Sequence, residues 1–129
     1  MSSHLKDKVV TYLLALEKPD WETARALCAD TATVWHNDGK GDETLDEYFD
    51  GLKRTIGSYE SIRYDILRRL SQPGGVLQQH VVHVTGKDGR RGEVHAAVYF
   101  GFDDAELINR IEAYANYIPV DQDSADQDS

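Results

Sequence analysis

The apolar positions in the first half of the chain recur with helical spacing. Residues 5–18 carry them at three- and four-residue steps, which predicts a helix. A shorter helix is expected to follow, with Asp20 as its N-cap. A third helix is expected to begin at Thr44, because Thr44 and Glu47 match the capping box. An apolar stripe follows them, and this helix is expected to end near Gly57.

The second half of the chain instead shows the alternation of strands. Short turns separate the alternating segments, and one of them carries the hairpin signal Asp88-Gly89. Such connections favour an antiparallel meander, and the length of the segments favours a bent sheet. The sequence predicts four strands, at residues 60–71, 76–86, 92–102 and 106–117.

Apolar residues fall on both faces of the second of these strands. Three helices can cover only one face of the sheet. We therefore expect the other, outer face to meet a second subunit in a homodimer. One face carries Val76, Gln78, His80, Val82 and Val84, and the other carries Leu77, Gln79, Val81 and His83.

The segment Thr31–Asn37, TATVWHN, is the first candidate for chemistry. It is predicted to be a short strand before a turn, with Val34 and His36 on one face and Trp35 on the other. A histidine delivered by a strand end into an apolar interior is a candidate proton-transfer group. Tyr12 falls within the apolar stripe of the first helix, so its buried hydroxyl needs a partner or a ligand.

Charge and composition exclude several classes of partner. The net charge of −9 disfavours nucleic acids and anionic membranes. No apolar run resembles a signal peptide or a membrane span. The single cysteine, Cys28, is expected to be a small buried residue, and the cytoplasm is the expected compartment. Residues 1–118 are expected to form one domain, and residues 119–129 a disordered acidic tail.

The order of these elements resembles that of the nuclear transport factor 2-like superfamily, in its SnoaL-like and ketosteroid isomerase-like branch. Two segments carry the resemblance, the junction ALCADTATVWHN and the alternating pattern from Ile108 to Asn116. The resemblance implies an α+β fold. In it, three N-terminal helices pack on a strongly bent, mostly antiparallel sheet to form a cone, as in cystatin-like folds.

The resemblance to ketosteroid isomerase also implies roles for individual residues. Tyr12 matches the position of that family's oxyanion-hole tyrosine, and His36 matches the position of its aspartate base. The second oxyanion donor of that family corresponds to Val98, which cannot donate a hydrogen bond. This difference argues against ketosteroid isomerase activity itself, and the Arg and Asp constellation of limonene epoxide hydrolases is not evident.

The resemblance also turns one face of the last strand toward the pocket. On that strand, ionisable and polar residues alternate with apolar ones, which is unusual for a pure core. Together with the two candidate catalytic residues, the expected pocket-lining residues are Val34, Val98, Phe100, Arg110, Glu112, Tyr114 and Asn116.

No cofactor or metal is expected. His80 and His83 are three residues apart on a strand, so they point to opposite faces and do not form a metal pair. Which of His80, His83 and His95 reaches the pocket stays open. No P-loop or G-x-G-x-x-G motif supports nucleotide binding.

Two functions remain. The first is a cofactor-free isomerase, cyclase, dehydratase or related lyase acting on a small apolar molecule with a carbonyl or hydroxyl group. In it, His36 acts as the base and Tyr12 as the oxyanion donor. The alternative is a non-catalytic ligand-binding or dimeric assembly module of the same fold, which the missing second donor favours.

Overall fold

Three helices and six strands make up the part of the chain that the computed structural model describes, residues 2–120. The helices are α1 (Ser2–Glu17), α2 (Trp21–Ala26) and α3 (Leu45–Gly57). The strands are β1 (Cys28–His36), β2 (Asp42–Thr44), β3 (Tyr59–Gln72), β4 (Gly75–Gly86), β5 (Arg91–Phe102) and β6 (Ile108–Val120).

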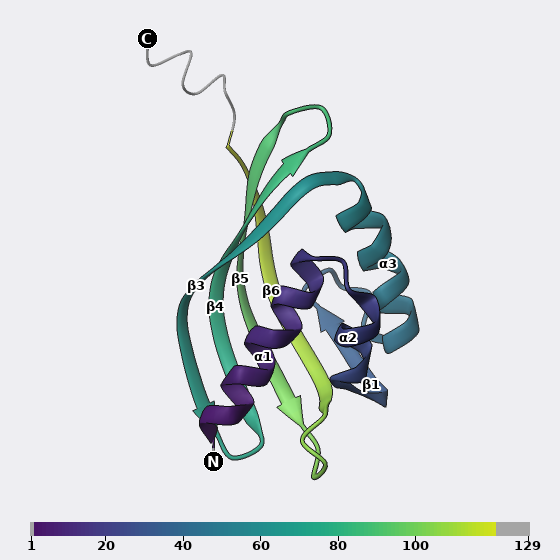
Figure 1. The fold of residues 1–129 in the computed structure, drawn as a ribbon, viewed down its shortest axis with the longest axis vertical. Coiled ribbons are helices and arrows are strands. Elements are labelled where there is room, and N and C mark those ends of the chain that lie inside the picture. Colours follow the sequence, from purple (N-terminus) through teal and green to yellow (C-terminus); the bar gives the residue numbers. More distant parts are fainter. Residues whose placement is uncertain (1, 121–129) are drawn as a thin grey trace.

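The six strands form one bent sheet in the order β2-β1-β6-β5-β4-β3. The last four strands are the predicted antiparallel meander. β1 joins the meander by pairing with β6 in parallel, and β2 pairs with β1 in antiparallel fashion. α1 lies across one face of this sheet, and α2 and α3 lie beside it near β1 (Figure 1). The α+β cone expected from the sequence is therefore confirmed.

Local signals fix the ends of these elements as predicted. The Asp20 side chain accepts a hydrogen bond from the Thr23 amide at the start of α2. At the start of α3, Thr44 and Glu47 each accept a hydrogen bond from the other's backbone amide, which completes the capping box. In the turn between β4 and β5, Gly89 has a φ of 86°, which favours glycine.

Several boundaries differ from those predicted, and three of the differences bear on the sheet or the tail. β1 begins at Cys28, which the sequence placed on the second helix, because α2 already ends at Ala26. Part of the predicted loop before α3 forms β2 against β1. β6 continues to Val120, where it pairs with Arg91, so it includes two residues of the predicted tail. The rest of that tail, residues 121–129, lies outside the described residues.

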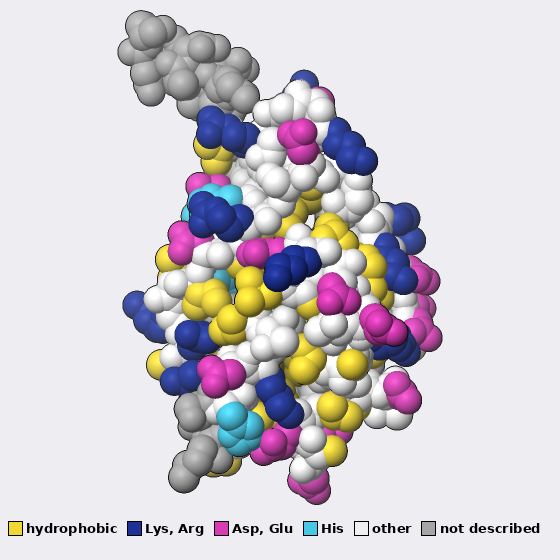
Figure 2. Space-filling model, viewed as in Figure 1, with side chains coloured by type: hydrophobic (Ala, Val, Ile, Leu, Met, Phe, Trp, Pro, Cys, Tyr) yellow, Lys and Arg dark blue, Asp and Glu magenta, His cyan; other side chains and the backbone are white. Residues whose placement is uncertain are grey.

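The core lies between the helices and the face of the sheet that they cover, which we call the helix-covered face. The side chains of Val34, Val76, Val98, Phe100 and Ile111 point to this side, and all are buried. The opposite side is the outer face, to which Gln79, His95 and Tyr114 point. On the side viewed in Figure 2, acidic and basic side chains are intermingled. Within residues 2–120, no helix is long and apolar enough to cross a membrane.

Candidate active site

His36 lies at the end of β1, on the helix-covered face beside Val34, as strand alternation predicted. Its side chain is 32% exposed, so it sits at the rim of the core and not in bulk solvent. The ring nitrogen Nδ1 lies 3.7 Å from a carboxylate oxygen of Glu43 on β2. On its other side, the imidazole packs against the Tyr48 ring of α3, with 5.5 Å between centroids.

Tyr12 lies at the centre of the core. Its side chain is 1% exposed, and its ring meets the edge of Phe100 at a centroid distance of 6.0 Å. The hydroxyl lacks a well-formed hydrogen bond to any atom of residues 2–120, although the Tyr48 hydroxyl is close enough to interact with it. Burial raises the pKa of Tyr12 well above its ordinary value, so the phenol stays protonated and remains a donor.

Tyr48 therefore connects the two candidate catalytic residues. Its ring contacts His36 and its hydroxyl interacts with Tyr12. Burial raises the pKa of Tyr48 to about 12, and the interaction with the Tyr12 hydroxyl partly opposes that rise. Tyr64 on β3 adds a third buried phenol, whose pKa is raised by burial and by the nearby Tyr48.

The histidine that reaches the core is His80. It is buried on the helix-covered face of β4, with its ring 5.3 Å from the ring of Tyr64. Gln78, two residues earlier on the same face, is also buried, and its side-chain nitrogen lies 2.8 Å from Nδ1 of His80. Burial lowers the pKa of His80 to about 4. His83 and His95 lie on the outer face and contact Glu93.

The four predicted pocket-lining residues of β6 lie on the outer face of the sheet and not in the core. Ladder pairing places Ile111 opposite Phe100 and Ala113 opposite Val98, so the apolar residues of β6 take the helix-covered face. Burying ions there would be costly. The residues that consequently point to the outer face are Arg110, Glu112, Tyr114 and Asn116. Val34, Val98 and Phe100 do lie in the core with Tyr12.

These outer residues have partners of their own. Arg110 is 3.0 Å from Asp42 and 3.0 Å from Glu112, and it donates a hydrogen bond to the Thr33 hydroxyl. The Tyr114 ring packs on Trp35 at 5.0 Å. These contacts tie β6 to β1 and β2, which is a structural role.

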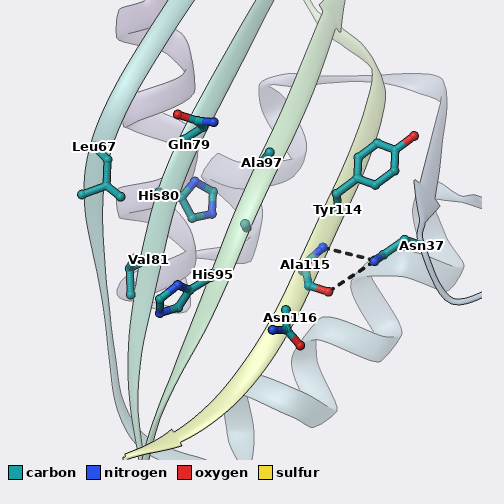
Figure 3. Close-up of a pocket in the computed structure, with 11 residues that line it drawn as sticks. Asn37, Leu67, Gln79, His80, Val81, His95, Ala97, Tyr114, Ala115 and Asn116 are labelled. Carbon is teal, nitrogen blue, oxygen red and sulfur yellow. Dashed lines mark hydrogen bonds between the residues drawn. The ribbon is translucent and has the colours of Figure 1, made fainter.

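The outer face also carries a hollow of about 500 Å³. Figure 3 shows it lying over β4, β5 and β6, with His95, Tyr114 and Asn116 among its lining residues. Asn37 borders it and is hydrogen-bonded to the backbone of Ala115. Neither Tyr12 nor His36 lines this hollow.

Two further candidates for chemistry are the cysteine and a possible metal site. Cys28 is buried as expected, and burial raises the pKa of its thiol to about 12, so it is a poor nucleophile. Among the described residues, no group of three or more potential ligands is arranged to hold a metal ion.

The model of a SnoaL-like domain matches residues 9–111. The chain belongs to the SnoaL-like domain family. The match contains every helix except the first turns of α1, and it includes both Tyr12 and His36.

Several solved structures are similar to this SnoaL-like chain. An LEH-like epoxide hydrolase of M. tuberculosis is 19% identical, with a TM-score of 0.72 over 89% of this chain and 84% of its own. A Δ5-3-ketosteroid isomerase of Mycobacterium sp. is 20% identical, with a TM-score of 0.74 over 91% of this chain and 99% of its own. SalBIII, an epoxide hydrolase/cyclase-like enzyme in pyran ring formation in salinomycin, is 12% identical. Its TM-score is 0.77 over 88% of this chain and 92% of its own. At these identities the likeness shows the fold, and a search of curated proteins gave no match.

Sequence reasoning assigned no site role to three polar residues that the structure places on or near the helix-covered face. Tyr48 and Tyr64 fall at apolar positions of α3 and β3, where a tyrosine resembles any other core residue. Gln78 did give a signal, because an amide that shares a strand face with three valines breaks an apolar row. What could not be predicted was that its oxygen would have no hydrogen-bond partner within residues 2–120.

Proposed function

We propose that the protein binds a small, largely apolar molecule with a carbonyl or hydroxyl group at the helix-covered face, where Tyr12 and His36 lie. In this proposal His36 moves a proton, and the Tyr12 hydroxyl stabilises the oxyanion that develops. The observation that carries the proposal is the buried, poorly satisfied Tyr12 hydroxyl, because a core hydroxyl without a well-formed hydrogen bond costs about 1–3 kcal/mol. Such a cost is accepted more readily at a functional site than in a purely structural core.

The surroundings of His36 fit a proton-transfer role. The Glu43 carboxylate lies on the Nδ1 side of the ring, which favours a proton on Nδ1 and leaves Nε2 to receive one from a substrate. Tyr48 braces the ring from α3. The reaction class would be that of an isomerase, cyclase, dehydratase or related lyase. The similar structures include an epoxide hydrolase, an isomerase and a cyclase-like enzyme, which supports small-molecule chemistry of this kind.

The experiment begins with a thermal-shift screen of steroid, terpene and polyketide-like compounds, because a ligand that binds only the folded state raises the melting temperature. Compounds that bind are then assayed for turnover. His36→Ala should lower kcat by about 10²–10⁴, the usual contribution of one proton-transfer group. His95→Ala, on the outer face, is the matched control and should leave kcat unchanged. Full activity in His36→Ala would refute the role.

One observation favours the alternative of a non-catalytic binding module. The Tyr64 ring occupies part of the helix-covered side, and Val98 offers no second hydrogen-bond donor. A binding module would retain its ligand unchanged, and the His36 and Tyr12 variants would then alter affinity without altering any turnover.

We further propose that the outer face binds a second copy of the chain. Leu67 is 64% exposed and Tyr114 is 58% exposed on this face, and Leu77 is exposed nearby. Leu67→Asp should raise the dimer dissociation constant by about 100-fold or more, because a two-fold interface contains the change twice. Leu14→Asp, at an exposed leucine of α1, is the control. Sedimentation equilibrium measures both variants, and a monomeric wild-type protein would contradict the proposal.

A further inference from the structure

The turn between β4 and β5 is basic, in contrast to the chain as a whole. Residues 87–91 read KDGRR, so three cations and one acid give the turn a net charge of +2, whereas the chain carries −9. The Arg90 guanidinium lies 3.7 Å from Asp88, and the Arg90 side chain is 86% exposed. Among the described residues, Lys87 and Arg91 have no ion-pair partner. The turn therefore presents positive charge that its surroundings leave largely unneutralised.

A hollow of about 410 Å³ opens beside this turn, and Lys87 and Arg90 line it. Two tyrosines line it as well, Tyr59 at the start of β3 and Tyr117 near the end of β6. Burial and the neighbouring Tyr117 raise the pKa of Tyr59, so this phenol stays protonated and can donate a hydrogen bond. The remaining lining residues are Ser58, Gly86 and Asp88.

The Tyr117 ring has its place in this hollow because residue 92 is a glycine. A Cβ atom added to Gly92 would lie 2.3 Å from the Tyr117 hydroxyl oxygen, so any other residue there would displace the ring. Tyrosine, lysine and arginine side chains all carry O–H or N–H groups that can donate. The hollow thus gathers donors and positive charge, which suits a carboxylate.

The chain leaves β6 at the same end of the sheet. Val120 pairs with Arg91, the first residue of β5, so the last described residue lies beside the basic turn (Figure 1). The nine residues that follow, 121–129, read DQDSADQDS and include four aspartates. Nine residues can span about 30 Å, because an extended chain covers about 3.3–3.6 Å per residue. Neighbouring strands are only about 4.8 Å apart, so these residues can reach the hollow.

The segment 121–129 and the hollow also have complementary charges, −4 on the segment against the two cations of the hollow. Ion pairs between exposed side chains are individually weak. A segment that is joined to its site by a short link, however, acts at an effective concentration in the millimolar range. Several weak contacts made together can then hold the segment, and added salt should loosen them because the charges are exposed.

We propose that the acidic segment 121–129 binds in the hollow beside the β4-β5 turn. Its aspartates lie against Lys87 and Arg90, and the two tyrosine hydroxyls donate to their carboxylates. The occupant is a segment of the same chain, because that segment begins beside the hollow and is rich in the acceptors that the hollow lacks. The inference is independent of the proposed function, since it involves neither candidate catalytic residue.

Paramagnetic NMR on the full chain tests this contact. A nitroxide is attached through Ser129→Cys, and Cys28 stays unlabelled because it is buried. Relaxation enhancement is measured at the amides of Gly86 and Gly75, the last and first residues of β4, which lie at opposite ends of the sheet. In 1 M NaCl, where the Debye length is about 3 Å, the enhancement at Gly86 should fall at least about threefold from its low-salt value. Gly75 is the distant reference and should show little enhancement in either buffer.

Two double variants separate the contact from a general effect of charge. Lys87→Glu with Arg90→Glu reverses the cations of the hollow, so the enhancement at Gly86 should fall at least about threefold at low salt. Arg68→Glu with Arg69→Glu changes the net charge equally on β3, and this matched control should leave the enhancement unchanged. Replacing the four aspartates of the segment by lysine should restore the enhancement in the chain with the reversed hollow.

Any of three results would overturn the inference. They are an enhancement at Gly86 that salt does not lower, one that Lys87→Glu with Arg90→Glu does not lower, or an equal loss in the β3 control. Amide chemical shifts of β4 check that each variant is folded. Lys87→Gln with Arg90→Gln is the second variant if the charge reversal prevents folding.

A free peptide with the sequence of residues 121–129 distinguishes the chain's own segment from a separate acidic partner. At a concentration equal to that of the protein, about 0.1 mM, the peptide should leave the enhancement at Gly86 unchanged, because the linked segment acts at millimolar concentration. Displacement of the segment by this equimolar peptide would overturn the assignment of the occupant.

Discussion

The two faces of the sheet treat their polar residues in opposite ways. On the outer face, Arg110 is paired with Asp42 and Glu112 at 3.0 Å each. On the helix-covered face, Gln78 has a buried oxygen without a hydrogen-bond partner among the described residues. Satisfied ions are explained by stability and solubility, whereas an unsatisfied buried group has a cost that folding alone does not explain. The comparison therefore places the candidate chemistry on the face with fewer polar residues.

His83 on β4 is an exception on the outer face, because its buried Nε2 forms no hydrogen bond within residues 2–120. Nε2 of His83 lies 3.6 Å from Asp65, and its Nδ1 lies 3.7 Å from Glu93. These contacts join β3, β4 and β5 through partly exposed side chains, where each pair contributes about 0–1 kcal/mol. We therefore assign His83 and its two acidic neighbours to the surface of the fold.

The largest predicted difference between the faces concerns two adjacent residues of β6. Ile111 is buried against Val34 and Phe100, so Ile111→Ala should lower the free energy of unfolding by about 4 kcal/mol. Glu112→Ala should cost less than about 1 kcal/mol, because it removes a partly exposed ion pair. Urea denaturation at one protein concentration measures both. Equal losses would mean that the faces have been assigned incorrectly.

A somewhat smaller effect distinguishes two histidines by pH. The pKa of His80 falls from 6.5 to about 4 on folding, so the unfolded chain binds the proton more readily. The free energy of unfolding is therefore highest above pH 6.5. It decreases by about 3 kcal/mol in total as the pH falls from 6.5 through 4. His80→Gln should flatten the profile of unfolding free energy between these values, and His95→Gln should not. A profile that His80→Gln leaves unchanged would contradict the burial of a neutral imidazole.

Strand alternation could be predicted from the sequence, but the orientation of the last strand could not. Alternation correctly grouped Val34 with His36, and Gln78 with His80. It also grouped the ionisable residues of β6, yet a period of two only says which residues share a face. Which face is inside depends on the register with β5, where Phe100 faces Ile111. That register is a tertiary property, which alternation along a single strand does not give.

Helix boundaries were predicted better because their causes are local. Thr44 and Glu47 satisfy amides three residues apart, so the capping box can be identified in the sequence alone. The link from Tyr12 through Tyr48 to His36 joins α1, α3 and β1, and its members could be found singly but not as a set. The sequence thus indicates individual residues of the candidate site. The contacts between those residues depend on how the helices pack on the sheet.

The most direct measurement of the central claim compares Tyr12→Phe with Tyr114→Phe. If the Tyr12 hydroxyl serves a ligand and not the fold, Tyr12→Phe should raise the free energy of unfolding of the ligand-free protein by about 1 kcal/mol. The same change should lower kcat on the identified substrate by about 10²–10³, the effect of removing one oxyanion donor. Tyr114→Phe, exposed on the outer face, should change neither quantity. A Tyr12→Phe protein that is less stable and fully active would contradict the account.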